Sequence, residues 1–415
     1  QYAAFLPRWQ RVPASGSRSE LRGVDGCFEV IEQLAGTALP ASTWLRAVLP
    51  ARVDDVHDGM LDELIGAGDV AWWGLSPLPG GDGVVALAPA DRAGLLRRAP
   101  DPLPDDDAAG RAVVTALAAG GAQFFRDVAD RVGVGSGDCP ITTDAALIDV
   151  LWRLVWTGMV TNDGWSALRA RISGAGKTTA PRRGRLGLPH RSGPPAGAGR
   201  WSLLPTVPSD PAGAAAAIAQ SLLDRYGIVT RGSVVAERFD GGFARLYRVL
   251  TAFEDVGRCR RTYAIEGLGA AQFTLPAAVD RLRATPPPTT SGRTVTVLAA
   301  TDPANAYGAA LPWPPLAGPD VAHRPGRKAG ALVVLVDGEL VLYLERGGKS
   351  LLVWGWDEAI LADAAIGLGH HGHRVGMDRS VVTRINGAAP TEPHSRALSL
   401  AGFLPTPRGL RSPRG

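Results

Sequence analysis

The chain has 415 residues, 45% hydrophobic and 20% charged, which predicts two to four domains of ordinary soluble composition. No run approaches the roughly 18 consecutive apolar residues of a membrane helix, so we expect no membrane partner. The 44 Lys plus Arg exceed the 40 Asp plus Glu by four, too few to indicate nucleic-acid binding alone. The separated Cys27, Cys139 and Cys259 favour a reducing, cytoplasmic setting. The start at Gln1, without Met or signal region, predicts a fragment of a longer polypeptide.

Residues 25–95 combine three short helical periods with a strand pair. Apolar side chains recur at helical spacing over 28–65. The strand-like runs 70–75 and 84–87 then flank a loop rich in glycine, which favours a hairpin. Three helices followed by a hairpin predict a winged helix, and residues 1–24 are interpreted as the tail of a preceding module.

Two further copies of this pattern are predicted. The second winged helix is expected over 96–170, with helices at 108–119, 122–132 and 143–157. The third is expected over 201–284, with helices at 212–226, 231–238 and 242–256 and a strand at 259–265. Between them, residues 171–200 hold seven basic and no acidic residues among many Gly and Pro, which predicts a basic disordered linker.

A strand-rich segment follows a stiff Pro-rich spacer at 285–292. The apolar runs 331–336 and 339–344 are joined by Asp337-Gly338, a turn that hairpins prefer because both residues accept positive φ. With a further strand at 350–354, a small antiparallel β-barrel is expected over 293–415. The predicted fold class is therefore α+β, with tandem winged-helix modules followed by a small β-barrel.

The third helix of a winged helix usually enters the major groove, so its outward face indicates whether it binds DNA. In the third copy the apolar side chains share one face, whereas Arg245 and Arg248 project opposite, a pattern suited to phosphates. The alternative is an ordinary solvated helix face. The predicted nucleic-acid-binding arginines are Arg238, Arg245, Arg248, Arg258, Arg260 and Arg261.

The third helix of the second copy differs, because its predicted outward face holds Trp152 and Trp156. Two exposed tryptophans predict a partner surface. A neighbouring module or subunit is favoured over stacking on unpaired bases, since Trp is enriched in protein interfaces.

The rigid loop 300–314 gathers polar and aromatic groups. Asp302 could activate a water, Asn305 could read a base edge, and Tyr307 or Trp313 could stack on a base. The favoured alternative is an Asx turn held by Asp302, with buried aromatic rings.

Three other motifs do not support a site. Residues 174–179 resemble the end of a phosphate loop but lack its first Gly and its flanking strand and helix. Residues 357–360 resemble an acidic helicase motif without a phosphate loop, so no ATPase activity is expected. Residues 370–373 contain three His, interpreted as a solvated turn, and we expect neither metal nor bound cofactor.

Several long runs resemble the C-terminal part of the large helicase-related (Lhr) family, especially actinobacterial members. The runs are 257–273, 300–314, 323–345, 224–237 and Trp72-Trp73-Gly74. The resemblance implies a DNA-repair helicase whose ATPase core, with its ATP and Mg²⁺, lies N-terminal to this chain. It also implies an architecture similar to that of AlkZ-type DNA glycosylases, for whose glutamine motif only Gln10 and Gln272 are suggestive.

Three hypotheses follow from the residues and the resemblance. The leading one is a DNA-binding region, acting on single-stranded or tailed DNA beside its own helicase core. The second is a glycosylase for uracil or a damaged base, with Asp302, Asn305 and Gln272 as the catalytic candidates. The third is an oligomerisation module, for which the resemblance favours a homo-oligomer such as a tetramer, in the cytoplasm and associated with the nucleoid.

Overall fold

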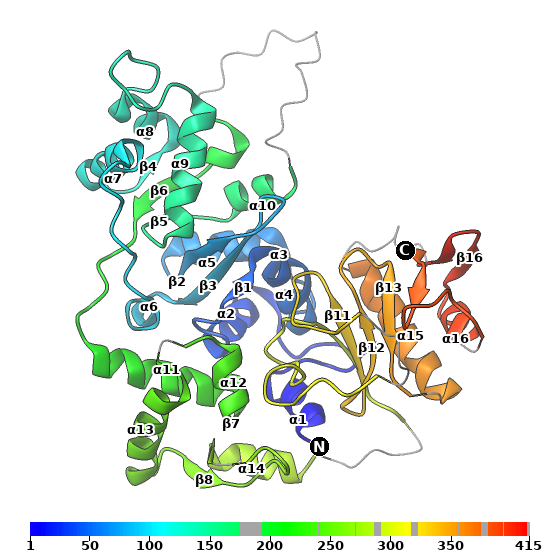
Figure 1. The fold of residues 1–415 in the computed structure, drawn as a ribbon. Coiled ribbons are helices and arrows are strands. Elements are labelled where there is room, and N and C mark those ends of the chain that lie inside the picture. The colour runs from blue at the N-terminus through cyan, green and yellow to red at the C-terminus, as the bar shows by residue number, and fades with distance from the viewer. Residues whose placement is uncertain are drawn as a thin grey trace. The chain divides into compact units, whose positions relative to one another are not determined.

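The computed structural model describes most of the chain (Figure 1). The described residues are 1–174, 193–239, 241–269, 271–285, 292–316, 323–355, 357–374, 381–392 and 394–412. They form two compact units, one made of residues 1–26, 43–56 and 218–415 and the other of residues 27–42 and 57–217. No helix among these residues combines the length and the apolar character needed to cross a bilayer.

The first module has the helix and strand order of a winged helix. Its elements are α2 (Gly23–Gln33), β1 (Leu39–Pro40), α3 (Ala41–Thr43), the π-helix η1 (Trp44–Val48), α4 (Leu49–Arg52), α5 (Asp58–Ala67), β2 (Val70–Pro77) and β3 (Gly83–Pro89). The predicted hairpin is confirmed, since β2 pairs antiparallel with β3 and β1 extends the sheet in the order β1-β3-β2. The short helix α6 (Ala90–Leu96) follows it.

The second module repeats the pattern, but the last strand of its sheet is far from the others in the sequence. Its elements are α7 (Ala108–Gly120), β4 (Gln123–Phe124), α8 (Phe125–Val132), α9 (Asp144–Trp156), β5 (Val160–Asn162) and β6 (Arg200–Leu203). The strand order is β4-β6-β5, and α10 (Ser166–Ile172) and the 3₁₀ helix η2 (Pro195–Gly197) lie between β5 and β6 in the sequence. Most of the predicted disordered linker, residues 175–192, lies outside the described residues, whereas residues 193–200 belong to this module.

The third module is a winged helix at nearly the predicted positions. Its elements are α11 (Pro211–Tyr226), β7 (Ile228–Val229), α12 (Arg231–Ala236), α13 (Gly242–Asp255), β8 (Arg260–Thr262) and β9 (Gln272–Thr274), with the sheet order β7-β9-β8. The helix α14 (Pro276–Arg283) follows the wing. The helix α1 (Tyr2–Trp9) contacts this module, because Trp9 Nε1 donates a 2.8 Å hydrogen bond to the Asp224 carbonyl.

The C-terminal strands form open sheets in the described residues, so the predicted closed barrel is not confirmed. One sheet contains β10 (Val295–Ala299), β11 (Leu332–Val336), β12 (Glu339–Leu344), β13 (Ser350–Val353) and β15 (Arg384–Ile385), in that order. A smaller sheet contains β14 (Val381–Val382), β17 (Gly409–Arg411) and β16 (Leu404–Thr406). The helices α15 (Glu358–Arg374) and α16 (His394–Leu400) complete the region.

Two apolar clusters explain why the larger sheet needs no closure. Strand side chains on one face pack with α15 residues such as Leu361 and Leu368. Those on the other face pack with Val12 and with Ala300 and Ala304, which follow β10. At the β10 edge the Ser15 amide donates to the Val295 carbonyl at 2.7 Å. Helix, loop and N-terminal segment therefore cover surfaces that a barrel would have enclosed. The Asp337-Gly338 turn is confirmed, with φ of 50° and 87°.

Candidate nucleic-acid interface

The three winged helices use their third helix in different ways. In the first module this helix is α5, whose outward side chains include the acidic Asp58, Asp62 and Glu63. Asp62 is paired with Arg169 of α10 and accepts a hydrogen bond from the Trp165 amide at 2.6 Å. A helix face that is acidic and engaged with another module is poorly suited to a phosphate backbone.

The third helix of the second module, α9, is covered within the chain. Trp152 is only 1% exposed and its Nε1 donates to the Ala196 carbonyl at 2.9 Å, while its ring meets Trp201 edge-on at 5.5 Å. Trp156 is 7% exposed, and a Cβ built on Gly83 of β3 would lie 2.3 Å from its ring. The prediction that both rings are exposed is therefore wrong, because η2, β6 and β3, which are distant in sequence, pack against these rings.

The third module is the one in which the corresponding helix presents arginines. Leu246, Leu250 and Phe253 of α13 are buried, whereas Arg248 is exposed and Arg245 is half-buried. The Arg245 guanidinium lies 5.6 Å from the centre of the Phe239 ring, which orients its side chain. The predicted division of α13 into an apolar and a cationic face is confirmed.

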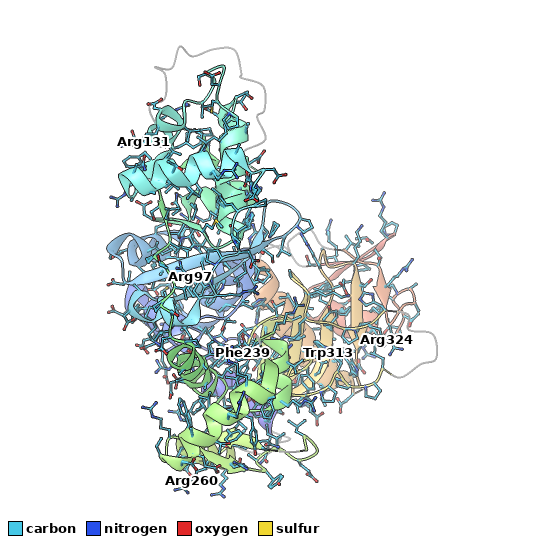
Figure 2. All side chains as sticks on the ribbon, turned by 60° about the vertical axis from the view of Figure 1, so that its left-hand side comes forward. Arg97, Arg131, Phe239, Arg260, Trp313 and Arg324 are labelled. Carbon is cyan, nitrogen blue, oxygen red and sulfur yellow. The ribbon has the colours of Figure 1, made fainter. Side chains whose placement is uncertain are left out.

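The wing and the end of α12 add further exposed cations. Arg238, Arg258 and Arg260 are exposed, and Figure 2 shows Arg260 at the outer end of the module. Arg261 is partly exposed, but it forms a 2.9 Å ion pair with Glu254 and lies over the Tyr247 and Phe273 rings. Arg261 therefore braces the wing against α13, and Arg258 in turn lies over the Phe253 ring of α13 at 5.1 Å.

Gln272, a catalytic candidate, closes the loop of the wing. Its side chain is 1% exposed in β9 and forms two hydrogen bonds with Ile265. Oε1 accepts from the Ile265 amide at 2.9 Å, and Nε2 donates to the Ile265 carbonyl at 2.8 Å. Both polar ends of this amide are thus occupied by the backbone of the wing loop.

Asp302, a second catalytic candidate, forms a buried ion pair with Arg52 at the end of α4. Both side chains are 0% exposed, and the guanidinium donates to the two carboxylate oxygens at 2.9 and 2.7 Å. Gln10 joins them, because its Oε1 accepts from Arg52 Nη2 at 2.9 Å and its Nε2 donates to the Arg225 carbonyl at 2.9 Å. In this arrangement the carboxylate is enclosed, whereas activation of a water requires access to it.

The other groups of the 300–314 loop are also engaged within the chain. Asn305 Nδ2 donates to the Ala300 carbonyl at 3.0 Å, and its Oδ1 accepts from the Tyr307 amide at 3.1 Å. Tyr307 donates to the Gly338 carbonyl at 3.0 Å, stacks on Trp313 with ring centres 6.4 Å apart, and has a pKa raised by burial. Trp313, labelled in Figure 2, also meets Tyr343 edge-on at 5.7 Å. This geometry agrees with the Asx-turn interpretation.

Two of the motifs set aside from the sequence have structural roles. Asp357 caps α15, since its Oδ1 accepts from the amides of Ala359 and Ile360. His370 and His371 lie within α15, so the predicted turn is wrong there. The described residues contain no group of three or more His, Cys, Asp or Glu arranged to hold a metal ion. Most of the remaining motif, the phosphate-loop-like run 174–179, lies outside the described part of the chain, from residue 175 onward.

Arg52 and Arg327 are site-forming residues that the sequence interpretation did not identify. Arg327 donates to the Thr301, Asp302 and Asn305 carbonyls at 2.8 to 3.0 Å and so fixes the backbone of the loop, whereas Arg52 binds the Asp302 side chain. Neither arginine stands in a recognisable motif, and each lies more than 20 residues from its partner in the loop. Within the loop, only Asp302-Pro303 could be interpreted from the sequence, because Asp-Pro commonly begins a turn.

These features define a tandem winged-helix protein whose third module presents arginines on α13 and on the wing. Models of the large helicase-related protein, winged-helix domain, match residues 1–90 and 208–294. The chain is 43% identical, over 99% of its length, to "Lhr helicase/probable uracil glycosylase" of Mycolicibacterium smegmatis. It is 40% identical, over 96% of its length, to "Lhr helicase/uracil glycosylase" of Escherichia coli. The chain belongs to the Lhr family, which confirms the resemblance, and it spans 28% and 27% of the length of these relatives.

A solved structure supports the fold independently. The DNA glycosylase AlkZ of Streptomyces sahachiroi has a TM-score of 0.51 and 14% identity to this chain. The likeness covers 92% of this chain and 97% of AlkZ. It therefore includes the order of winged helices and C-terminal strands as a whole, and at this identity it concerns the fold alone.

Proposed function

We propose that this chain is a DNA-binding region of a DNA-repair helicase and that its third winged helix makes the main contact. The observation that carries the proposal is the arginine face of α13, with Arg245 and Arg248, next to the exposed wing arginine Arg260. The corresponding helices α5 and α9 are acidic or covered. The family of the chain, whose relatives are named as helicases, supports the same proposal.

The chemistry of this surface suits phosphates better than base edges. Arg245 and Arg248 lie three residues apart on α13, on the side opposite Leu246 and Leu250. Cations at such spacing neutralise neighbouring phosphates and release counterions, which gives affinity without sequence preference. We propose single-stranded or tailed duplex DNA as the partner class, with α13 on the phosphates of the duplex part of a tailed DNA.

The remaining partners are proposed from the family. In the longer relatives a helicase core would bind ATP and Mg²⁺, and this chain would contribute neither a nucleotide site nor ATPase activity. We propose that it acts beside that core as part of a cytoplasmic, nucleoid-associated protein. A homo-oligomer, such as a tetramer, stays a proposal, and the covered Trp152 and Trp156 do not support it.

The test is a matched pair of double variants measured by fluorescence anisotropy on duplex DNA. Arg245→Ala with Arg248→Ala is expected to weaken binding at least tenfold at low salt, equally for unrelated sequences. Arg111→Ala with Arg131→Ala removes the same charge from two exposed arginines of the second module and is expected to change the affinity less than twofold. Equal effects of the two double variants would reject α13 as the main contact.

A glycosylase is the second candidate function, favoured by the fold of AlkZ and by the names of both relatives. The sequence-derived candidates Asp302, Asn305 and Gln272 stay proposals, and each is buried and hydrogen bonded in this structure. Single-turnover incubation with uracil-containing and alkylated DNA, followed by cleavage at abasic sites, tests this function. Product formation that persists in Asp302→Asn would remove Asp302 from the candidates.

A further inference from the structure

The wing loop of the third module exposes an aromatic ring that takes no part in the proposed phosphate contacts. Tyr263, directly after β8, is 84% exposed, the largest exposure among the large hydrophobic side chains of the described residues. Other tyrosines in this region, such as Tyr226 and Tyr307, are packed and hydrogen bonded. An exposed aromatic ring on a structured loop is a contact surface of low conformational entropy.

The wing holds this ring in a defined position. Gln272 binds both the amide and the carbonyl of Ile265, which closes the loop two residues beyond Tyr263. On the other side, Thr262 pairs with Gln272 in the β8–β9 ladder. Tyr263 is therefore anchored from both neighbouring segments, and its side chain can meet a ligand without first ordering the loop.

The charges nearby indicate the kind of ligand. Arg260 is exposed three residues before Tyr263, and Arg258 is exposed at the start of the wing. Cations that track a backbone next to an aromatic ring are the combination by which proteins bind unpaired nucleotides. The loop also exposes Glu266, which would repel a phosphate beyond the tip. The favourable charge thus precedes the ring along the wing, and the unfavourable charge follows it.

We propose that Tyr263 stacks on an unpaired base at the junction between duplex and single-stranded DNA. This inference rests on the proposed function, because α13 must bind the adjoining duplex. A ring stacks only where the face of a base is free, which in duplex DNA occurs at an end or beside a tail. The ring would add affinity for tailed DNA without adding sequence preference.

The experiment compares blunt duplex DNA with the same duplex carrying a 3′ or 5′ tail, with 2-aminopurine at the first unpaired position. Tyr263→Ala is expected to lower affinity for one tailed substrate about tenfold, and affinity for the blunt duplex less than twofold. The quenching of 2-aminopurine on binding is expected to disappear with it. Tyr263→Phe should keep both properties, and Val256→Ala, which removes another exposed side chain of this module, should change neither.

The possible results separate this inference from the proposed function. Unchanged quenching in Tyr263→Ala, or an equal loss on blunt and tailed DNA, would overturn the stacking role and leave the ring as a surface for a protein. The proposed function is judged only on the blunt duplex, by the loss in the Arg245 and Arg248 double variant. Because Tyr263 is exposed, its variants should keep the melting temperature, which a thermal scan verifies.

Discussion

At the scale of single residues, Arg52 joins segments that are far apart in the sequence. It binds both oxygens of Asp302 and the Gln10 side chain, and all three groups are fully buried. A buried charge left without its partner costs much more free energy than the intact pair contributes. The cluster is therefore a structural centre of its compact unit rather than a reaction site in this conformation.

Removal of one partner from this pair should be strongly destabilising. Arg52→Met is expected to lower the free energy of unfolding by about 3 to 5 kcal/mol, because the Asp302 carboxylate stays buried without a counter-charge. Urea unfolding followed by circular dichroism measures the change. Arg52→Met combined with Asp302→Leu is the control, and it should recover much of the loss. A double variant as unstable as the single one would contradict the explanation.

At the scale of elements, the sequence predicted those features that depend on residues close together in the chain. The Asp337-Gly338 turn, the hairpin of the first module and the two faces of α13 depend on periodicity and turn chemistry within a few residues, and the structure confirms them. The strand β6 pairs with β5 across 39 to 43 residues, and Arg52 meets Asp302 across 250 residues. No local period contains such contacts, so they could not be derived from the sequence.

The same limit explains the tryptophans of α9. In an isolated α9, Trp152 and Trp156 would lie on the outward face. In the chain, η2, β6 and the β2–β3 hairpin cover their rings. Trp152→Ala with Trp156→Ala should therefore lower the melting temperature, because each truncation leaves a cavity and costs about 3 to 5 kcal/mol. Analytical ultracentrifugation should give an unchanged mass. A smaller mass with an unchanged melting temperature would show that the rings join two protomers.

At the scale of the whole molecule, one winged-helix pattern serves two purposes. The third helices of the first two modules, α5 and α9, make contacts inside their own compact unit. In the third module, α13 and the wing carry four exposed or half-buried arginines, Arg245, Arg248, Arg258 and Arg260. This difference in surface chemistry, rather than the shared fold, is the basis for the proposed DNA contact.

The most direct test of that contact is the salt dependence of DNA binding by the Arg245→Ala, Arg248→Ala double variant. Each phosphate contact contributes roughly 0.9 to the slope of log affinity against log salt on duplex DNA, so the slope should become smaller by about two. The loss should be equal for unrelated sequences, because phosphate contacts carry no base information. An unchanged slope, in a variant with the wild-type melting temperature, would contradict the assignment of α13 as the DNA-binding surface.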